Sequence, residues 1–279
     1  SFTKVVLPAY SQSLLAITPC VSGVYDNVGG RGDADAGVDI FWKPSGRLQM
    51  TAALNPDFGQ VESDDLVVNF GAVESFFSDK RPFFTENQVL FEVPFGAGNS
   101  RLLYTRRIGG PGDDGSGAGD VAAAVKLNGS LGQVNYGVLA ASESGDAGRD
   151  FYALRATRDS DVHDFGGMLT HVDRPFLDRQ ATVLSFDHRY TPDARWDVRT
   201  QWVGSRIEQS GRSIRDNGFQ FRIDHDLGQS GGWRQQLWGL HSGKDLQLND
   251  IGYLDRNNFN QLRYEINRRI GSYPETSRY

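Results

Sequence analysis

Apolar and polar side chains alternate along most of this chain with a period of two residues, which is the period of a β-strand. In the stretch 182–190, Leu184 lies on one face of the predicted strand and Asp187 on the other. Similar alternation marks 121–128 and 219–224, and helical periodicity is almost absent. The pattern predicts an all-β protein whose strands have one apolar and one charged face.

Opposite polarity on the two faces is typical of transmembrane β-barrels, in which apolar side chains contact lipid and polar ones face the interior. We predict these lipid-facing residues: Leu184, Phe186, Phe219, Phe221, Val198, Trp202, Val121 and Val125. We predict these inward-facing residues: Arg222, Asp224, Asp187 and Lys126. Their charges indicate a wet interior. The mean hydropathy of −0.46 fits such a barrel, and the absence of any long apolar run excludes a helical membrane protein.

The connections between predicted strands alternate between short and long, as periplasmic turns and extracellular loops do in outer-membrane barrels. Short turns are predicted at 43–46, 96–100, 131–133, 159–162, 191–194 and 228–231. Long connections are predicted at 28–35, 55–87, 109–119, 143–149, 208–217 and 244–258, with one of medium length near 174–178. The segments between them predict an antiparallel transmembrane β-barrel of about fourteen strands. A soluble β-sandwich is the alternative fold, although it has no reason to sort its loops by end.

One segment departs from the strand pattern. From 63 to 77 four apolar residues fall at helical spacing, and Pro82 follows shortly after them. This predicts one short helix inside the longest connection, where 59–87 forms an inserted plug or cap at the barrel mouth. We expect this loop to be well ordered, because its helix has an apolar stripe.

Charge and cysteine content narrow the class of protein. The net charge of −6 and a pI near 5.4 argue against a nucleic-acid partner, which would favour a basic surface. A single cysteine, Cys20, excludes an internal disulfide. The chain begins Ser1-Phe2 without a methionine or an export signal, so we expect a mature fragment.

Four motifs are more specific than a barrel wall requires. They read LNPDFGQVE at 54–62, ESFFSDKRPFFTE at 74–86, YTRRIG at 104–109 and NDIGYLDR at 249–256. In these motifs the chain closely resembles a family of bacterial proteins of unknown function, in which a family 9 carbohydrate-binding module precedes an outer-membrane barrel domain.

The resemblance implies a location in the bacterial outer membrane and contact with membrane lipid. It also implies porin-like binding or passage of a solute, with a saccharide suggested by the companion module, and other envelope proteins as further partners. Cys20 departs from the aromatic residue common in the family, and Ser78-Asp79 departs from its usual Pro-Glu. The carbohydrate-binding module is missing from this chain, and no alternating apolar strand ends it, so we expect truncation at both ends.

The charged and aromatic residues of these motifs form the candidate site. Its predicted members are Asp57, Glu62, Glu74, Phe76, Phe77, Lys80, Arg81, Phe83, Phe84, Glu86, Arg106, Arg107, Asn249, Asp250, Tyr253 and Arg256. If the turns are sorted correctly, 60–86 and 249–256 meet at the end of the barrel that carries the long connections. Two interpretations stay open: a polar network that fixes the inserted loop, or a ligand platform whose aromatic rings stack on sugars.

Two acidic, glycine-rich loops offer the oxygen ligands that Ca²⁺ prefers. The residues are Asp33, Asp35 and Asp39 in the first loop, and Asp113, Asp114 and Asp120 in the second. Neither loop reproduces a complete calcium-binding motif, and no other cofactor is predicted.

An outer-membrane hydrolase and a structural subunit of an envelope assembly are the alternative functions. The sequence contains no G-x-S-x-G, H-E-x-x-H or P-loop motif, and its five histidines lie in separate predicted strands. His188 and His225 stand beside acidic residues, but alternation places them on the face opposite those neighbours. The sequence therefore predicts no catalytic residue.

Overall fold

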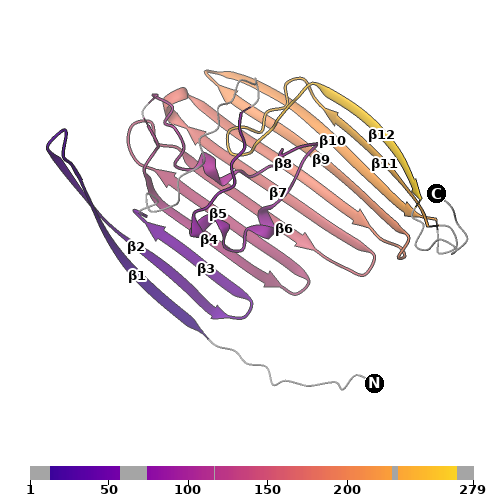
Figure 1. Cartoon of the computed structure of the whole chain (residues 1–279), viewed down its shortest axis with the longest axis horizontal. Coiled ribbons are helices and arrows are strands. Elements are labelled where there is room, and N and C mark those ends of the chain that lie inside the picture. The colour runs from indigo at the N-terminus through magenta and orange to yellow at the C-terminus, as the bar shows by residue number, and fades with distance from the viewer. Residues whose placement is uncertain (1–12, 57–73, 116, 228–231, 269–279) are drawn as a thin grey trace, which may run out of the picture.

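The computed structural model describes residues 13–56, 74–115, 117–227 and 232–268, whose strands form one antiparallel sheet (Figure 1). The twelve strands are β1 (Leu14–Asp26), β2 (Arg31–Ser45), β3 (Leu48–Leu54), β4 (Val121–Leu131), β5 (Val134–Glu143), β6 (Asp150–Arg158), β7 (His163–Arg174), β8 (Arg179–Tyr190), β9 (Trp196–Gln209), β10 (Arg212–Asp226), β11 (Trp233–Ser242) and β12 (Phe259–Arg268). Each strand pairs with its neighbours in sequence, and the described residues of β1 and β12 do not pair with each other. This up-and-down order is that of an outer-membrane barrel wall, here open, and it confirms the predicted fold class.

The number of strands in the described residues is lower than the roughly fourteen that the turn pattern predicted for the chain. The turn at 96–100 belongs to the connection between β3 and β4, and Pro94 and Arg101 on either side of it form only an isolated bridge. The loop predicted at 28–35 is a tight turn, because β2 already begins at Arg31. The loop predicted at 208–217 is also tight, since Ser210 with its φ of 49° and the glycine after it reverse the chain directly.

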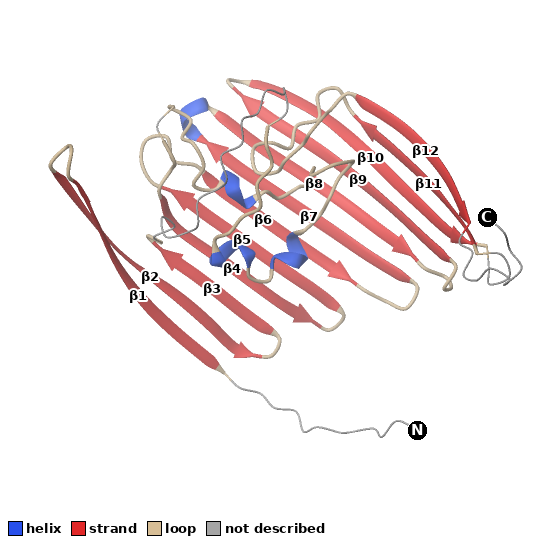
Figure 2. Ribbon diagram, viewed as in Figure 1, coloured by secondary structure: helices blue, strands red, loops and turns tan. Residues whose placement is uncertain are grey.

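Two connections are long enough to fold over the sheet. The inserted segment, residues 55–120, joins β3 to β4, and the β11–β12 loop, residues 243–258, joins the last two strands. Both connections leave their strands at the same end of the sheet, and in Figures 1 and 2 their described parts lie over the same face. We call this the long-connection end, the opposite one the short-turn end, and the covered face the inner face.

Helical structure in the described residues is confined to short turns of the chain (Figure 2). They are α1 (Pro82–Thr85), η1 (Gln88–Phe91), η2 (Thr105–Arg107) and η3 (Pro175–Leu177). None is long and apolar enough to cross a membrane.

The predicted helix at 63–77 is wrong where it can be checked. Residues 63–73 lie outside the described residues, as does most of the loop whose order was predicted, and Glu74 through Phe77 are not helical. The Phe77 amide donates to the hydroxyl of Tyr104 at 3.1 Å, a tertiary bond in place of one within a helix.

The outer face of the sheet carries the apolar side chains that alternation predicted. Leu184, Phe186, Trp202, Phe219 and Val125 are all more than a third exposed there. In the strand registers, Val198 and Phe221 lie on the same face. The four charged residues predicted to face inward lie on the inner face, with Lys126 and Asp224 buried.

Val121 is the exception, because it faces inward and is only 5% exposed. The β4–β5 register shifts between Val121 and Ala123, where an extra residue forms a β-bulge. A one-residue shift moves a side chain to the opposite face, which explains the wrong prediction.

The inserted segment packs an apolar core against the inner face. Phe91, Phe95 and Leu102 are almost completely buried, and so are the strand residues Phe151 and Met168 beneath the segment. The predicted wet interior is therefore wrong toward the long-connection end, where the inserted segment excludes water from apolar wall residues. Charged wall residues lie at both ends: Glu143, Arg174 and Arg179 at the long-connection end, and further ion pairs toward the short-turn end.

Candidate functional site

Asp79 and Arg81 connect distant parts of the inserted segment. Arg81 donates from Nε and Nη2 to the two carboxylate oxygens of Asp79 at 3.0 and 2.7 Å. It also donates to the backbone carbonyls of Ile108 and Thr105 at 2.7 and 2.8 Å, and its guanidinium lies 4.2 Å from the ring centre of Phe84. With only 12% of Arg81 and 2% of Asp79 exposed, this is a buried ion pair with nearly all of its polar atoms bonded.

A second cluster joins the motif at 74–86 to the one at 249–256. Arg107 donates to both carboxylate oxygens of Glu74, at 3.0 and 2.6 Å, and the Tyr253 hydroxyl donates to the Glu74 backbone carbonyl. The rings of Phe76, Tyr104 and Tyr253 pack together with centre-to-centre distances of 5.0 to 5.5 Å. Tyr104 and Tyr253 are buried by this packing, so most of their ring surface is occupied within the protein.

Backbone pairing supports the same contact. The amides of Arg101 and Tyr253 each donate to the other residue's carbonyl, at 2.8 and 2.9 Å. The Tyr104 amide donates to Ile251 at 2.7 Å. The inserted segment and the β11–β12 loop therefore lie side by side, as the turn sorting led us to expect.

Lys126 on β4 is 2% exposed and fixes α1 to the barrel wall. Its ammonium donates to the backbone carbonyls of Phe83 and Glu86, at the end of α1, where helix carbonyls lack partners within the helix. The Glu86 side chain accepts a bond from Gln49 on β3 at 3.0 Å.

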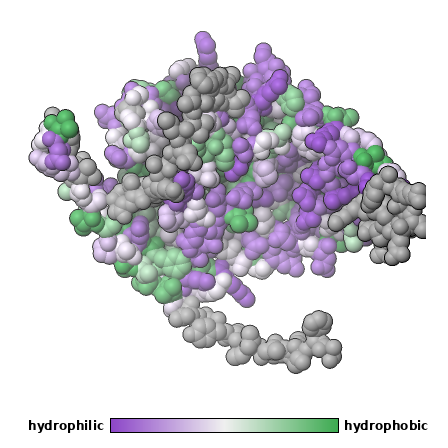
Figure 3. Space-filling model, in the orientation of Figure 1, coloured by the Kyte–Doolittle hydropathy of each residue, from purple (hydrophilic) through white to green (hydrophobic). Residues whose placement is uncertain are grey.

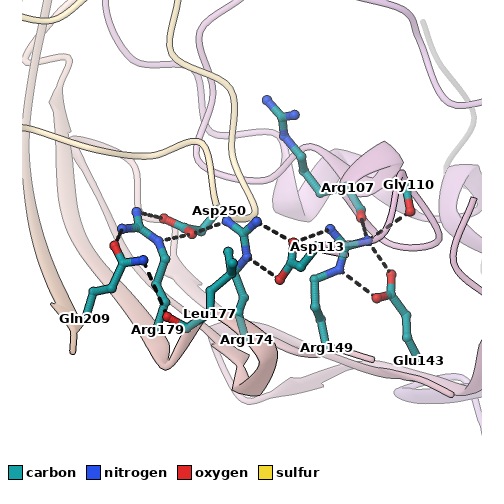
Figure 4. Close-up of polar contacts among 10 residues, drawn as sticks. All are labelled: Arg107, Gly110, Asp113, Glu143, Arg149, Arg174, Leu177, Arg179, Gln209 and Asp250. Carbon is teal, nitrogen blue, oxygen red and sulfur yellow. Dashed lines mark hydrogen bonds and ion pairs between the residues drawn. The ribbon is translucent and has the colours of Figure 1, made fainter. Parts of the chain in front are cut away.

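Six alternating charges form what we call the rim network, comprising Glu143, Arg149, Asp113, Arg174, Asp250 and Arg179 (Figure 4). Arg149 holds both oxygens of Glu143 at 2.7 and 2.8 Å, and lies 3.8 Å from Asp113. Arg174 donates to both carboxylate oxygens of Asp113, at 2.5 and 3.0 Å, and to the carboxylate of Asp250 at 2.8 Å.

The far end of the rim network is equally well bonded. Arg179 donates to both oxygens of Asp250 at 2.7 and 2.8 Å, and further to Gln209 and Gln247 at 3.0 and 2.9 Å. Glu143, Arg174 and Arg179 belong to strands, whereas Asp113 belongs to the inserted segment and Asp250 to the β11–β12 loop. The rim network thus links both long connections to the wall between β5 and β8.

Two carboxyl groups in these long connections have perturbed pKa values. Burial alone would raise the pKa of Asp79, but bonds from Arg81 and Thr105 and the charge of Arg81 outweigh it, so the pKa lies below its ordinary value. Burial likewise opposes ionisation of Asp250, and bonds from Arg179 and Arg174 again hold its pKa below the ordinary value. Both groups are carboxylates at neutral pH.

Other predicted site residues contribute less to these clusters. Asp57 and Glu62 lie outside the described residues, and Lys80 is exposed. Arg106 donates a long 3.4 Å bond to a backbone carbonyl, and the Arg256 guanidinium lies over the ring of Phe259. The remaining predicted members serve local packing: the rings of Phe83 and Phe84 pack edge to face, the ring of Phe77 lies 5.8 Å from the Arg106 guanidinium, and the Asn249 side chain accepts the Leu254 amide.

The first predicted calcium loop is not a loop, because Asp33, Asp35 and Asp39 lie along β2. Alternate residues of a strand are about 7 Å apart, too far for three of them to converge on one ion. In the second, Asp113 is bonded to Arg174. The part of the chain that the structure describes contains no group of three acidic, histidine or cysteine side chains able to hold a metal.

Five residues of these charged clusters escaped the sequence prediction: Asp79, Glu143, Arg149, Arg174 and Arg179. Asp79 was visible as a departure within the motif at 74–86, which is the one signal that pointed to it. The other four stand at strand ends among many scattered charges. Nothing local separates them from ordinary surface residues.

Paired charges continue along the inner wall toward the short-turn end, and the face seen in Figure 3 is largely hydrophilic around the inserted segment. Arg155 pairs with Asp187, Asp197 with both Arg189 and Arg199, and Asp224 with both Arg222 and Arg234. Gly166 makes room for the first of these pairs, since a Cβ there would lie 2.4 Å from each partner.

Aromatic and imidazole rings mark the outer face near the short-turn end. The ring nitrogens of His163 and His188 are 3.0 Å apart, and both rings stack with Phe165. Trp196 stacks on His225 with ring centres 3.7 Å apart. These histidines therefore belong to an aromatic belt.

Comparison with solved structures finds low-identity matches to outer-membrane proteins of Vibrio cholerae. In-vitro folded OmpT in its trimer form is 9% identical, with 91% of this chain and 98% of that chain covered at a TM-score of 0.41. Outer-membrane expressed OmpT is 6% identical, with 94% and 98% covered at 0.38. A mutant of OmpT lacking loop L8 is 10% identical, with 82% and 93% covered at 0.36.

No curated protein matches the chain. Residues 13–126 match a family described as "Domain of unknown function (DUF5916)". The matched part contains three of the four motifs that carry the resemblance, and the motif at 249–256 lies beyond it. Over this part, the chain is similar to a family of unknown function.

Proposed function

We propose that this chain spans the bacterial outer membrane as part of a barrel whose interior holds its own inserted segment, and that it binds or passes a small polar solute. One observation carries the proposal: the two faces of a single sheet have opposite polarity. The outer face presents Leu184, Phe186, Trp202 and Phe219, and the inner wall presents paired charges. A sheet with that distribution is suited to lipid outside and water inside.

The inner wall favours an uncharged polar solute over an ion. Each wall arginine named above has a carboxylate partner, so the wall offers many fixed donors and acceptors with little net charge. Hydroxyl groups of a saccharide both donate and accept hydrogen bonds, and so match such a surface. The family resemblance, with its carbohydrate-binding module, points to the same class of solute.

Passage would require movement of the inserted segment. Its apolar core covers the inner wall, and the rim network ties it at the long-connection end through Asp113, while Asp250 ties the β11–β12 loop there. Replacing both carboxylates by amides removes the two links and leaves the wall unchanged. We therefore expect the Asp113→Asn/Asp250→Asn variant to be more permeable than the unmodified protein.

The test is conductance in planar lipid bilayers, combined with swelling of liposomes in isosmotic saccharide. The unmodified protein should give small or rare conductance steps, and the double variant larger or more frequent ones with faster swelling. Asp146→Asn, an exposed loop substitution, is the matched control. If inserted protein of both kinds passes neither ions nor saccharide, the proposal of solute passage is wrong.

A further inference from the structure

The outer face has a groove between β8, β9 and β10, near the long-connection end. Its volume is about 380 Å³, and its walls include Leu184, Trp202 and Arg206. Gly204 lies among them, and a Cβ there would lie 2.5 Å from the Trp202 ring, so only glycine leaves this space open. The groove therefore combines an apolar side with a cationic one.

Two arginines stand at the cationic side. Arg206 on β9 and Arg215 on β10 are direct partners in the strand register, and both border the groove. Like charges directly opposite each other across a strand pair are destabilising. Arg206 bonds to Glu208, whereas Arg215 has no carboxylate partner among the residues that the structure describes. An uncompensated positive charge is thus held beside the groove.

The neighbouring polar groups do not cancel that charge. Asn217, which also borders the groove, is neutral. The Asp216 carboxylate lies on the inner face, where it accepts the Asp245 amide of the β11–β12 loop, so the sheet separates it from the groove. Ser205 has its side chain on the inner face, where its hydroxyl accepts the Gln247 amide.

The groove lies at a boundary on the outer face. Toward the short-turn end the side chains are apolar, with Leu184, Trp202 and Phe219 exposed. Toward the hairpin tip they are polar, with Arg206, Glu208 and Arg215. A lipid whose acyl chain lay along the apolar side would have its headgroup level with the arginine pair.

We propose that this groove binds the phosphate headgroup of an anionic membrane lipid, with its acyl chain against Leu184 and Trp202. The planar guanidinium matches phosphate in bidentate geometry, and two of them are suited to a doubly charged phosphomonoester. The inference rests on the proposed membrane location, because it places lipid against the outer face.

The probe is dioleoylphosphatidic acid, added to the purified chain in detergent micelles, with retained lipid measured by native mass spectrometry. The Arg206→Gln/Arg215→Gln variant should retain the lipid about tenfold less strongly than the unmodified protein. The matched control is Arg158→Gln/Arg195→Gln, which removes the same charge at the short-turn end and should behave like the unmodified protein. Circular dichroism checks that all three proteins keep their sheet content.

Further arms separate the sources of binding. Phosphatidylcholine, whose headgroup carries no net charge, should be retained weakly. Inorganic phosphate at millimolar concentration should displace little phosphatidic acid, because it lacks the acyl chains. Equal retention by the double variant, or equal retention of phosphatidylcholine, overturns the proposal. Failure to insert into liposomes would contradict the membrane location, and the micelle measurement reports on lipid binding independently of it.

Discussion

At the scale of a residue, the buried carboxylate of Asp79 connects two parts of the inserted segment. It accepts hydrogen bonds from Nε and Nη2 of Arg81 and from the Thr105 hydroxyl, and so joins the chain before α1 to the chain around η2. An amide at this position keeps the size of the side chain and removes the charge. The substitution would therefore break the buried ion pair between Asp79 and Arg81.

We therefore expect Asp79→Asn to weaken docking of the inserted segment by about 3 kcal/mol, the cost of breaking a buried ion pair. The measurement is the rate of tryptic cleavage within 74–115 under native conditions. Asp146→Asn, in an exposed loop, is the control and should leave the rate unchanged. Unchanged cleavage in Asp79→Asn would mean that apolar packing alone holds the segment.

The lowered pKa values of Asp79 and Asp250 predict how acid acts on the two long connections. A carboxyl group whose pKa is lower in the folded state stabilises that state fully above its ordinary pKa, and loses the contribution as pH falls through the folded value. Hydrogen exchange at 74–115 and 243–258 should stay slow from neutral pH down to about 4, and accelerate below the ordinary value of 3.8. Acceleration centred near pH 6.5 would instead implicate histidine.

At the scale of elements, aromatic rings of the inserted segment pack directly against glycines of the wall. A Cβ added to Gly137 of β5 would lie 2.7 Å from the ring of Phe91. One added to Gly218 of β10 would lie 2.4 Å from the ring of Phe95. These glycines are needed for close approach, because any larger residue would displace the ring above it.

Gly137→Leu should therefore destabilise docking of the inserted segment by roughly 1–3 kcal/mol, the usual range for overpacking. The sheet content measured by circular dichroism should persist, whereas tryptic cleavage within 74–115 should be faster. Gly167→Leu is the matched control, because a Cβ there is in ordinary contact with Phe186 on the outer face. Equal cleavage rates in the two variants would contradict the packing described for Phe91.

For the molecule as a whole, the tryptophans distinguish the two faces of the sheet. Trp202 lies on the outer face and is 38% exposed, whereas Trp238 on β11 packs against the core of the inner face. In single-tryptophan variants reconstituted with brominated lipids, fluorescence of Trp202 should be quenched and that of Trp238 should not. The opposite result would show that the inner face contacts lipid.

The sequence alone determined the class of fold, the polarity of the two faces and the meeting of two distant motifs. Alternation with a period of two is a property of the strand backbone itself, so it can be recognised without knowledge of any partner. Seven of eight residues predicted for the outer face lie there, and Val121 fails only because a bulge shifts its register. The contact between the motifs at 74–86 and 249–256 followed from sorting the connections by length.

Only the tertiary structure decided which charges are paired and what fills the interior. Asp113 and Arg174 are 61 residues apart in the chain, and Arg179 and Asp250 are 71 apart, so no local pattern connects them. The turn at 96–100 resembles a barrel turn in sequence, but it lies within the inserted segment, since apolar residues on both sides of it are buried against the inner wall. Charge pairing and the position of this turn depend on which surfaces meet after folding. The local sequence around a buried arginine does not differ from that around an exposed one, because its partner is distant in the chain.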